Sequence, residues 1–83
     1  MNNKIIYQPK AVKQLRKIPE NCFIRRKIED LKDFPNCRNV KSLVSGEYDY
    51  RLRVGHYRVL FNFDGVINII SIEEIRRRNE RTY

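Results

Sequence analysis

The stretch that decides the fold is "YDYRLRVGHYRVLFNF", residues 48–63. On both sides of Gly55-His56, apolar or aromatic residues alternate with polar or charged ones. This period of two is typical of a β-strand with one buried face. Glycine at the first position of a two-residue loop is typical of a type II′ hairpin turn. We therefore predict an antiparallel hairpin that turns at Gly55-His56.

The proposed turn fixes which residues of the two strands face each other. The apolar pairs would be Val54 and Tyr57, Leu52 and Val59, Tyr50 and Phe61, and Tyr48 and Phe63. All eight side chains then share one face, an agreement that a shift of one residue would destroy. We expect this face to pack on helices.

The opposite face of the hairpin, here called the open face, would carry Arg53 directly opposite Arg58, with Arg51 beside them. Like charges facing each other across strands are destabilising. Either an anion binds between these arginines, or the side chains extend apart into water. The open face is also expected to carry an apolar patch that the chain's own tail or a partner covers. The members of this patch would be Leu60, Ile67 and Ile69.

Working outward, "KIIYQP" (4–9) predicts a short strand, and "KAVKQLRKI" (10–18) has apolar residues at helical spacing. A second helix is expected from Pro19 to about Asp33. Strands are expected at 40–44 and, after a turn at Asp64-Gly65, at 66–72. This order predicts one α+β domain spanning 1–83, with an N-terminal strand and a two-helix hairpin packed on a mainly antiparallel β-sheet.

Composition narrows the class of partner. The chain has 83 residues, is 41% hydrophobic and 34% charged, and carries a formal charge of +8. This positive charge favours an acidic partner. We expect nucleic acid first, an acidic protein second and an anionic membrane third. All seven lysines precede residue 42, and every later cation is an arginine. Arginine binds phosphate through a planar fork of donors, which favours the anion-binding interpretation.

Several classes of function are not expected. No apolar run approaches the ~20 residues of a membrane span, and the start lacks a signal-peptide pattern, so we expect a cytoplasmic protein without membrane contact. Cys22 and Cys37 are too far apart for a CxxC pair, and His56 is the single histidine, so no metal or cofactor is expected. No Ser/His/Asp set, paired acids or Gly-rich phosphate loop is present. Any catalysis would therefore use arginine, tyrosine or lysine.

The chain ends in "IRRRNERTY" (75–83), and the last predicted strand directs this segment back toward the hairpin. Its arginines and Tyr83 would then reach the face of Arg51, Arg53 and Arg58. The alternative is a frayed basic tail without a role.

The stretch "RLRVGHYRVLF" (51–61), a strand reading "INIISI" (67–72) and an arginine-rich segment closing on tyrosine resemble the RelE/ParE superfamily of bacterial toxins. The resemblance covers nearly the whole chain. It implies the toxin of a type II toxin–antitoxin system, with a cognate antitoxin as partner. The RelE branch cleaves mRNA in the ribosomal A site without a metal, by attack of a ribose 2′-OH on the adjoining phosphate. The ParE branch shares the fold and is associated with DNA gyrase, so a gyrase inhibitor without nuclease activity is the alternative.

The resemblance also implies roles for individual residues. Arg58 would contact the scissile phosphate, and Arg51 would stabilise charge or take part in acid–base chemistry. Arg77 would assist the phosphate or the leaving group, and Tyr83 would stack on the base or deprotonate the 2′-OH. Further RNA contacts are expected from Arg53, Arg76, Arg78 and Arg81. The register of the tail leaves Arg76 and Arg78 as alternatives to Arg77.

The chain departs from the RelE pattern at Asp49, where RelE has a second basic residue. An acid at this position would either orient Arg51 or act as a base.

Overall fold

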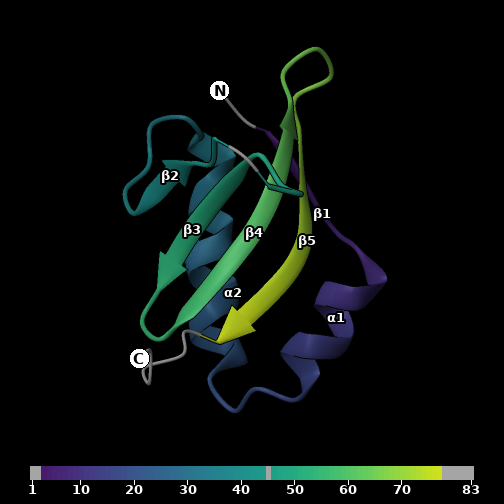
Figure 1. Ribbon diagram of the computed structural model, residues 1–83, viewed down its shortest axis with the longest axis vertical. Helices are drawn as coiled ribbons and strands as arrows, with labels where there is room; N and C mark the ends of the chain where they lie inside the picture. The colour runs from purple at the N-terminus through teal and green to yellow at the C-terminus, as the bar shows by residue number, and fades with distance from the viewer. Residues whose placement is uncertain (1–2, 45, 78–83) are drawn as a thin grey trace.

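A computed structural model describes residues 3–44 and 46–77. The elements follow in the order β1 (Lys4–Tyr7), α1 (Pro9–Arg16), α2 (Asn21–Glu29), a 3-10 helix η1 (Asp30–Asp33), β2 (Val40–Ser42), β3 (Tyr50–Val54), β4 (Tyr57–Asp64) and β5 (Ile69–Arg77). The strands form one sheet in the order β1-β5-β4-β3-β2 (Figure 1). Strand β1 runs parallel to β5, and the other neighbours are antiparallel. The predicted α+β architecture is confirmed.

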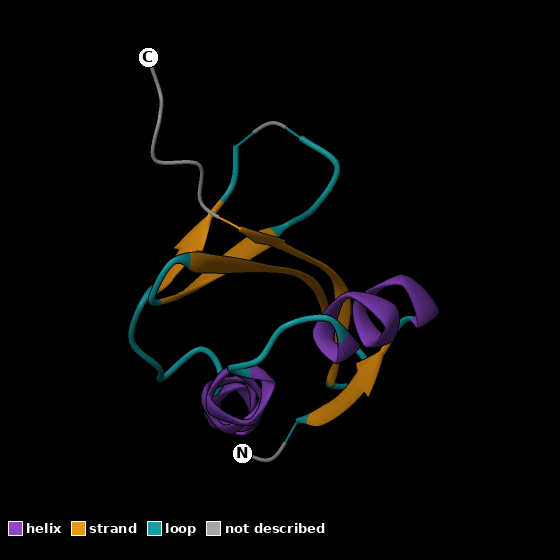
Figure 2. Ribbon diagram, turned by 90° about the horizontal axis from the view of Figure 1, so that it is seen from below, coloured by secondary structure: helices purple, strands orange, loops and turns teal. Residues whose placement is uncertain are grey.

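Both helices cover one face of the sheet (Figure 2). Pro9 begins α1, where its missing N–H costs no hydrogen bond. The buried stripe of the second helix continues through η1, which ends at Asp33 as predicted. Phe61 lies fully buried in the middle of the core, stacked on Tyr50 and edge-on to Phe34. Truncating such a ring to alanine costs about 3–5 kcal/mol, so Phe61 is central to stability.

The β3–β4 hairpin has the predicted register over its inner part. Val54 pairs with Tyr57, Leu52 with Val59, Tyr50 with Phe61, and Arg53 with Arg58. Gly55 has φ +57°, the positive angle that the first position of a type II′ turn requires. The sequence pattern therefore predicts the turn and the inner register of this hairpin correctly.

The predicted pairing of Tyr48 with Phe63 is wrong, because β3 begins only at Tyr50. The N–H of Asp49 donates to the side-chain Oδ1 of Asn62 instead of to a backbone carbonyl, which ends the ladder. Tyr48 lies on the open face, where its hydroxyl donates to Glu74. The strand predicted at 40–44 likewise ends at Ser42.

The predicted start of the last strand at Val66 is wrong. The strand spans Ile69–Arg77, and a four-residue turn at 65–68 precedes it. The carboxylate of Asp64 stabilises this turn by accepting the N–H groups of Val66 and Ile67. The predicted apolar patch does not form, because Ile67 lies in this turn at the hairpin tip.

Leu60 does lie on the open face, but it is only 5% exposed. The described residues of the loop between β2 and β3, 43–44 and 46–49, lie over this face, opposite the helices (Figure 2). Leu43 and Tyr48 of this loop line the same pocket as Leu60. The loop between β2 and β3 thus lies beside this leucine on the open face.

A β-bulge in the β4–β5 pair decides which residues of β5 reach the open face. Ile72 and Ile75 are both buried, although residues three apart on a regular strand point to opposite faces. The register shifts between Leu60 and Phe61, so that Glu73 is the extra residue. The N–H of Ile75, next to the irregularity, donates to Oε1 of Gln14 in α1 at 2.6 Å. The bulge therefore lets both isoleucines pack in the core.

Neither α1 nor α2, the α-helices of the described ranges, is long and apolar enough to cross a membrane.

Candidate functional site

A row of arginines crosses the open face of the sheet. Arg58 of β4 lies opposite Arg53 of β3 on one side and opposite Arg76 of β5 on the other. Because neighbouring strands are about 4.8 Å apart, the three Cα atoms span only about 10 Å. We call Arg53, Arg58 and Arg76 the arginine row.

A second row of residues runs beside the first on the same face. It consists of Lys41 in β2, Arg51 in β3, Leu60 in β4 and Glu74 in β5. Two cations stand at one end of this row and a carboxylate at the other. The open face is therefore strongly cationic on the side of β2 and β3, and partly neutralised on the side of β5.

A pocket of about 470 Å³ lies over these two rows. Arg51, Arg58 and Arg76 line one part of it, and Leu60 forms an apolar surface beside them. The loop that follows β2 supplies the rest of the wall through Leu43, Gly46, Glu47 and Tyr48. The pocket thus combines guanidinium groups with an aromatic ring and apolar side chains, which suits a nucleotide better than a simple inorganic anion.

The hairpin arginines have no anionic partner within the described ranges. No carboxylate of residues 3–44 or 46–77 lies within 4.0 Å of Arg51, Arg53 or Arg58. The Nε of Arg51 is buried and finds no hydrogen-bond acceptor in this part of the chain. Buried donors are nearly always paired in native proteins, so this nitrogen is an exception on the open face.

Arg76 is different, because Glu74 holds it through two hydrogen bonds. Nε donates to Oε2 at 2.9 Å and Nη2 donates to Oε1 at 3.3 Å. Glu47 lies 3.7 Å from the same guanidinium. The hydrogen bond from Arg76, followed by that from Tyr48, holds the pKa of Glu74 below its ordinary value. Glu74 is therefore ionised at neutral pH, although its side chain is buried.

The same carboxylate acts on Tyr48. The hydrogen bond from the Tyr48 hydroxyl to Glu74, at 2.9 Å, raises the pKa of the phenol, and partial burial adds to this effect. A phenol with a raised pKa keeps its proton at neutral pH. Tyr48 is thus unsuited to act as a general base.

The structure brings together four of the eight predicted site residues, namely Arg51, Arg53, Arg58 and Arg76. Arg77 pairs with Tyr57, whose hydroxyl reaches Glu20 at the start of α2, so it shares the helix-facing side of the sheet. The bulge causes this arrangement, because without the extra residue Arg77 would share the face of Arg58. Three further predicted residues lie outside the described residues: Arg78, Arg81 and Tyr83.

Two strand residues of this face were not predicted from the sequence. Lys41 lies directly opposite Arg51, and only the β2–β3 register, which the sequence pattern leaves unspecified, reveals it. Glu74 could have been found from the spacing of Ile72 and Ile75, which requires an irregularity in the strand. Asp49 forms no ion pair with Arg51, so it does not orient that side chain.

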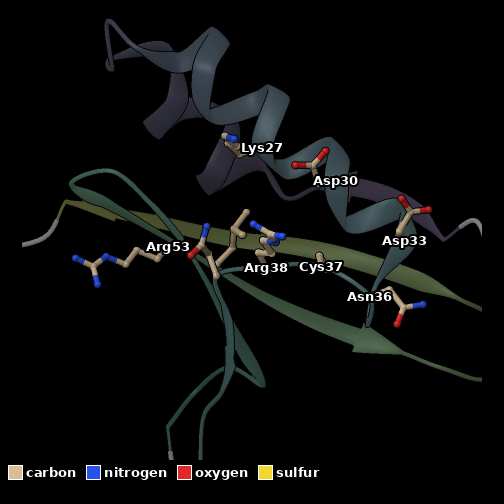
Figure 3. A pocket seen from close by; sticks show the side chains of 9 residues that line it. Lys27, Asp30, Asp33, Asn36, Cys37, Arg38 and Arg53 are labelled. Atoms are coloured by element: carbon tan, nitrogen blue, oxygen red, sulfur yellow. The ribbon is translucent and has the colours of Figure 1, made fainter.

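A separate pocket of about 390 Å³ lies between α2 and the segment that leads into β2. Its lining mixes cations with acids: Lys27, Asp30, Asp33, Cys37, Arg38 and Arg53 are among its residues. Arg53 points away from Asp30 and Asp33 (Figure 3). Burial, with help from both aspartates, raises the pKa of Cys37, which keeps the thiol protonated. Because its charges offset one another, this pocket is a weaker candidate site.

Comparisons with known proteins find one matching family and several similar structures. The family model of the ParE toxin of type II toxin–antitoxin systems (parDE) matches residues 5–81. No protein with curated annotation matches the sequence.

Solved structures give the same fold. A chain of the archaeal RelE–RelB complex from Pyrococcus horikoshii is 25% identical, with a TM-score of 0.80, covering 96% of this chain and 99% of that one. A chain of the RelBE2 toxin–antitoxin complex from Mycobacterium tuberculosis is 22% identical, with a TM-score of 0.76 and coverages of 94% and 100%. The isolated RelE toxin of E. coli is 12% identical, with a TM-score of 0.77 and coverages of 94% and 86%. The last two similarities show the fold alone.

Proposed function

We propose a function for this chain from the premise that it belongs to the ParE toxin family of type II toxin–antitoxin systems, within the RelE/ParE superfamily. It is a toxin of a type II system with a RelE-like fold. Our proposal is that it cleaves mRNA in the ribosomal A site, as a ribosome-dependent endoribonuclease that needs neither a metal nor a cofactor.

The observation that supports this proposal is the set of unpaired arginines on the open face. Arg53 and Arg58 face each other at a cost in stability, and neither has a carboxylate partner among the described residues. Arg51 lies beside them with a buried, unpaired Nε. A phosphodiester would offset the repulsion by accepting hydrogen bonds from these guanidiniums.

The chemistry proposed for the site is an internal displacement at phosphorus. The ribose 2′-oxygen attacks the adjoining phosphorus as a base removes its proton, and the bond to the 5′-oxygen breaks as that oxygen is protonated. The products are a 2′,3′-cyclic phosphate and a free 5′-OH. Arg51 and Arg58 would stabilise the charge that builds up on the phosphate oxygens in the transition state.

The role considered for Arg77 passes to Arg76 in this proposal, because Arg76 is the β5 arginine on the face of Arg58. Tyr83 remains the proposed residue that stacks on the base or removes the 2′-OH proton. Arg53 and Lys41 would hold the RNA backbone on either side of the cleaved phosphate, and Arg78 and Arg81 are proposed as further RNA contacts.

The proposed partners are a cognate antitoxin, the ribosome and mRNA, in the cytoplasm. The similar chain from P. horikoshii comes from a RelE–RelB complex, and the one from M. tuberculosis comes from a toxin–antitoxin complex. An acidic segment of the antitoxin would inhibit the toxin by lying on the unpaired arginines.

The second candidate function is inhibition of DNA gyrase without catalysis. The match to a family model that is defined by ParE favours it. In that case the arginine face would bind a protein or DNA surface, and no RNA would be cut.

Induced expression separates the two functions. An mRNA endoribonuclease stops translation and leaves cuts at defined codon positions, which primer extension on translated messages maps, without inducing a DNA-damage response. A gyrase inhibitor induces the DNA-damage response and leaves messages intact. The second pattern would refute the nuclease proposal.

A further inference from the structure

Glu74 is an acid in a place where a simple RNA-binding surface would have none. It is 8% exposed and lies on the open face, opposite Leu60 and two residues before Arg76. Burying a carboxylate is costly unless its oxygens are paired. Here the cost is offset by the two hydrogen bonds from Arg76, the hydroxyl of Tyr48 at 2.9 Å and Nζ of Lys10 at 3.5 Å.

The geometry of the Arg76 contact leaves part of the guanidinium available. Glu74 takes up Nε and one hydrogen of Nη2. An arginine has five N–H donors, so the two hydrogens of Nη1 remain, while the Glu47 carboxylate lies 3.7 Å from Nη2. Since Arg76 lines the 470 Å³ pocket, these donors can serve a ligand there while Glu74 fixes the plane of the group.

The contact with Tyr48 fixes a second part of the pocket wall. Tyr48 belongs to the loop that rises over the open face, and Glu47 and Gly46 precede it along the same wall. One carboxylate therefore ties a strand residue and a loop residue together across the pocket. Lys10 adds a link from α1 to the same oxygen that accepts from Tyr48.

We propose that Glu74 is a positioning residue for the cleavage reaction: it touches no substrate, and it holds Arg76 and the Tyr48 loop at the spacing that the RNA backbone requires. This inference rests on the proposed nuclease function. The proposal predicts that loss of Glu74 lowers the cleavage rate without weakening RNA binding. Glu74 lowers the positive potential of the pocket, so a role in attracting RNA would be served better without it.

The test compares Glu74→Gln with Glu73→Gln, which removes the same charge from the neighbouring residue of β5. Single-turnover cleavage of an mRNA on programmed ribosomes should slow about tenfold for Glu74→Gln, because displacing a catalytic group lowers the rate by up to about 100-fold and Glu74 acts only through its partners. The affinity for a non-cleavable 2′-O-methyl RNA oligonucleotide should stay the same or increase. Glu73→Gln should stay within about twofold of wild type in both measurements. Equal rates for the two variants would refute the proposal, and so would a parallel loss of affinity and rate.

A double-mutant cycle shows whether Glu74 acts through Arg76. Tyr48→Phe measures how much of the rate depends on the hydrogen bond between Tyr48 and Glu74. In an Arg76→Ala background, Glu74→Gln should lower the cleavage rate by no more than Tyr48→Phe does. An undiminished effect of Glu74→Gln in that background would contradict positioning of Arg76. Tyr48→Phe removes a single hydroxyl and keeps the cycle interpretable if Glu74→Gln folds poorly.

The positioning can also be measured without any cleavage. The Nε–H resonance of Arg76 should exchange slowly with water in the wild-type toxin and in Glu73→Gln, and rapidly in Glu74→Gln. Slow exchange in Glu74→Gln would refute the positioning role. A wild-type toxin that cleaves no message would refute the proposed function instead, while this measurement would still report on Glu74.

Discussion

Arg58 and Arg76 lie opposite each other on neighbouring strands, yet they differ in their surroundings. Arg58, like Arg51 and Arg53 beside it, has no carboxylate within reach in the described part of the chain. Arg76 is held by Glu74 and approached by Glu47. The hairpin end of the arginine face thus carries unbalanced charge, and the β5 end carries charge that is ordered and largely neutralised.

This difference separates two tasks that one surface can perform. Unpaired guanidiniums give the strongest attraction to phosphate, at the cost of mutual repulsion across the strands. A guanidinium that is paired to a buried carboxylate attracts less but is fixed in orientation. We therefore assign charge stabilisation to the hairpin arginines and positioning to the network around Arg76.

The largest effect is expected at the unpaired end. Arg58→Ala should lower the single-turnover rate of mRNA cleavage by about 10²–10³-fold, which is typical for loss of one donor to a transition-state oxyanion. Arg26→Ala removes an exposed arginine of α2 and serves as the control, with an expected rate within about twofold of wild type. A cleavage rate for Arg58→Ala close to that of Arg26→Ala would remove Arg58 from the site.

A smaller effect is expected at the paired end. Arg76→Ala should lower the cleavage rate about tenfold, because Glu74 already engages two of the five Arg76 donors and fewer are free for the phosphate. The salt dependence of RNA binding sharpens the comparison. Losing one phosphate contact lowers the slope of log K against log salt by about 0.7 for single strands. Arg58→Ala should show that decrease, and Arg76→Ala a smaller one. Equal slopes would mean that the pairing with Glu74 does not matter for binding.

The repulsion across the hairpin can be removed deliberately. Arg53→Glu places an acid opposite Arg58, and the free energy of unfolding should rise by about 0.5 kcal/mol, the usual size of a favourable cross-strand pair. The same change should weaken RNA binding, since it neutralises the unpaired end of the row. Urea denaturation measures the first effect. A variant that is less stable than wild type would show that the opposed arginines cost nothing.

The smallest effect is a pH dependence of stability. Arg76 and Tyr48 hold the pKa of Glu74 below its usual 4.5, so the unfolded chain binds this proton more tightly than the folded one. The stabilisation is therefore complete above the unfolded-state value and is lost as the pH falls through the lower folded-state value. Denaturation midpoints of wild type and Glu74→Gln should converge between about pH 5 and pH 3. A difference in denaturation midpoint between the two proteins that stays constant across that pH range would contradict the lowered pKa of Glu74.

Much of the fold follows from local sequence signals. The Gly55-His56 turn and the alternation around it suffice to place Arg53 opposite Arg58, because only one register buries every apolar residue. Asp64-Gly65 was misleading, since the turn extends to Asn68 and delays β5. The four-residue turn depends on hydrogen bonds from the N–H groups of Val66 and Ile67 to the carboxylate of Asp64. The alternation of apolar and polar residues does not reveal these bonds.

The site was predicted at its hairpin end and only partly at its β5 end. The choice between Arg76 and Arg77 depends on a bulge, and the bulge depends on burying Ile72 and Ile75 together against α1. Such a requirement is a property of the packed core rather than of the strand. Tyr48 escaped prediction for a related reason, because Asn62 ends the ladder through a side chain.

The central claim is that the unpaired arginines bind and activate an RNA phosphodiester. The most direct test adds purified toxin to ribosomes translating a defined message and identifies the ends of the fragments by mass spectrometry. We predict cuts in the A-site codon with 2′,3′-cyclic phosphate and 5′-OH ends, from wild type and Arg26→Ala but not from Arg58→Ala. Intact messages with active wild-type toxin, or identical cutting by Arg58→Ala, would contradict the account.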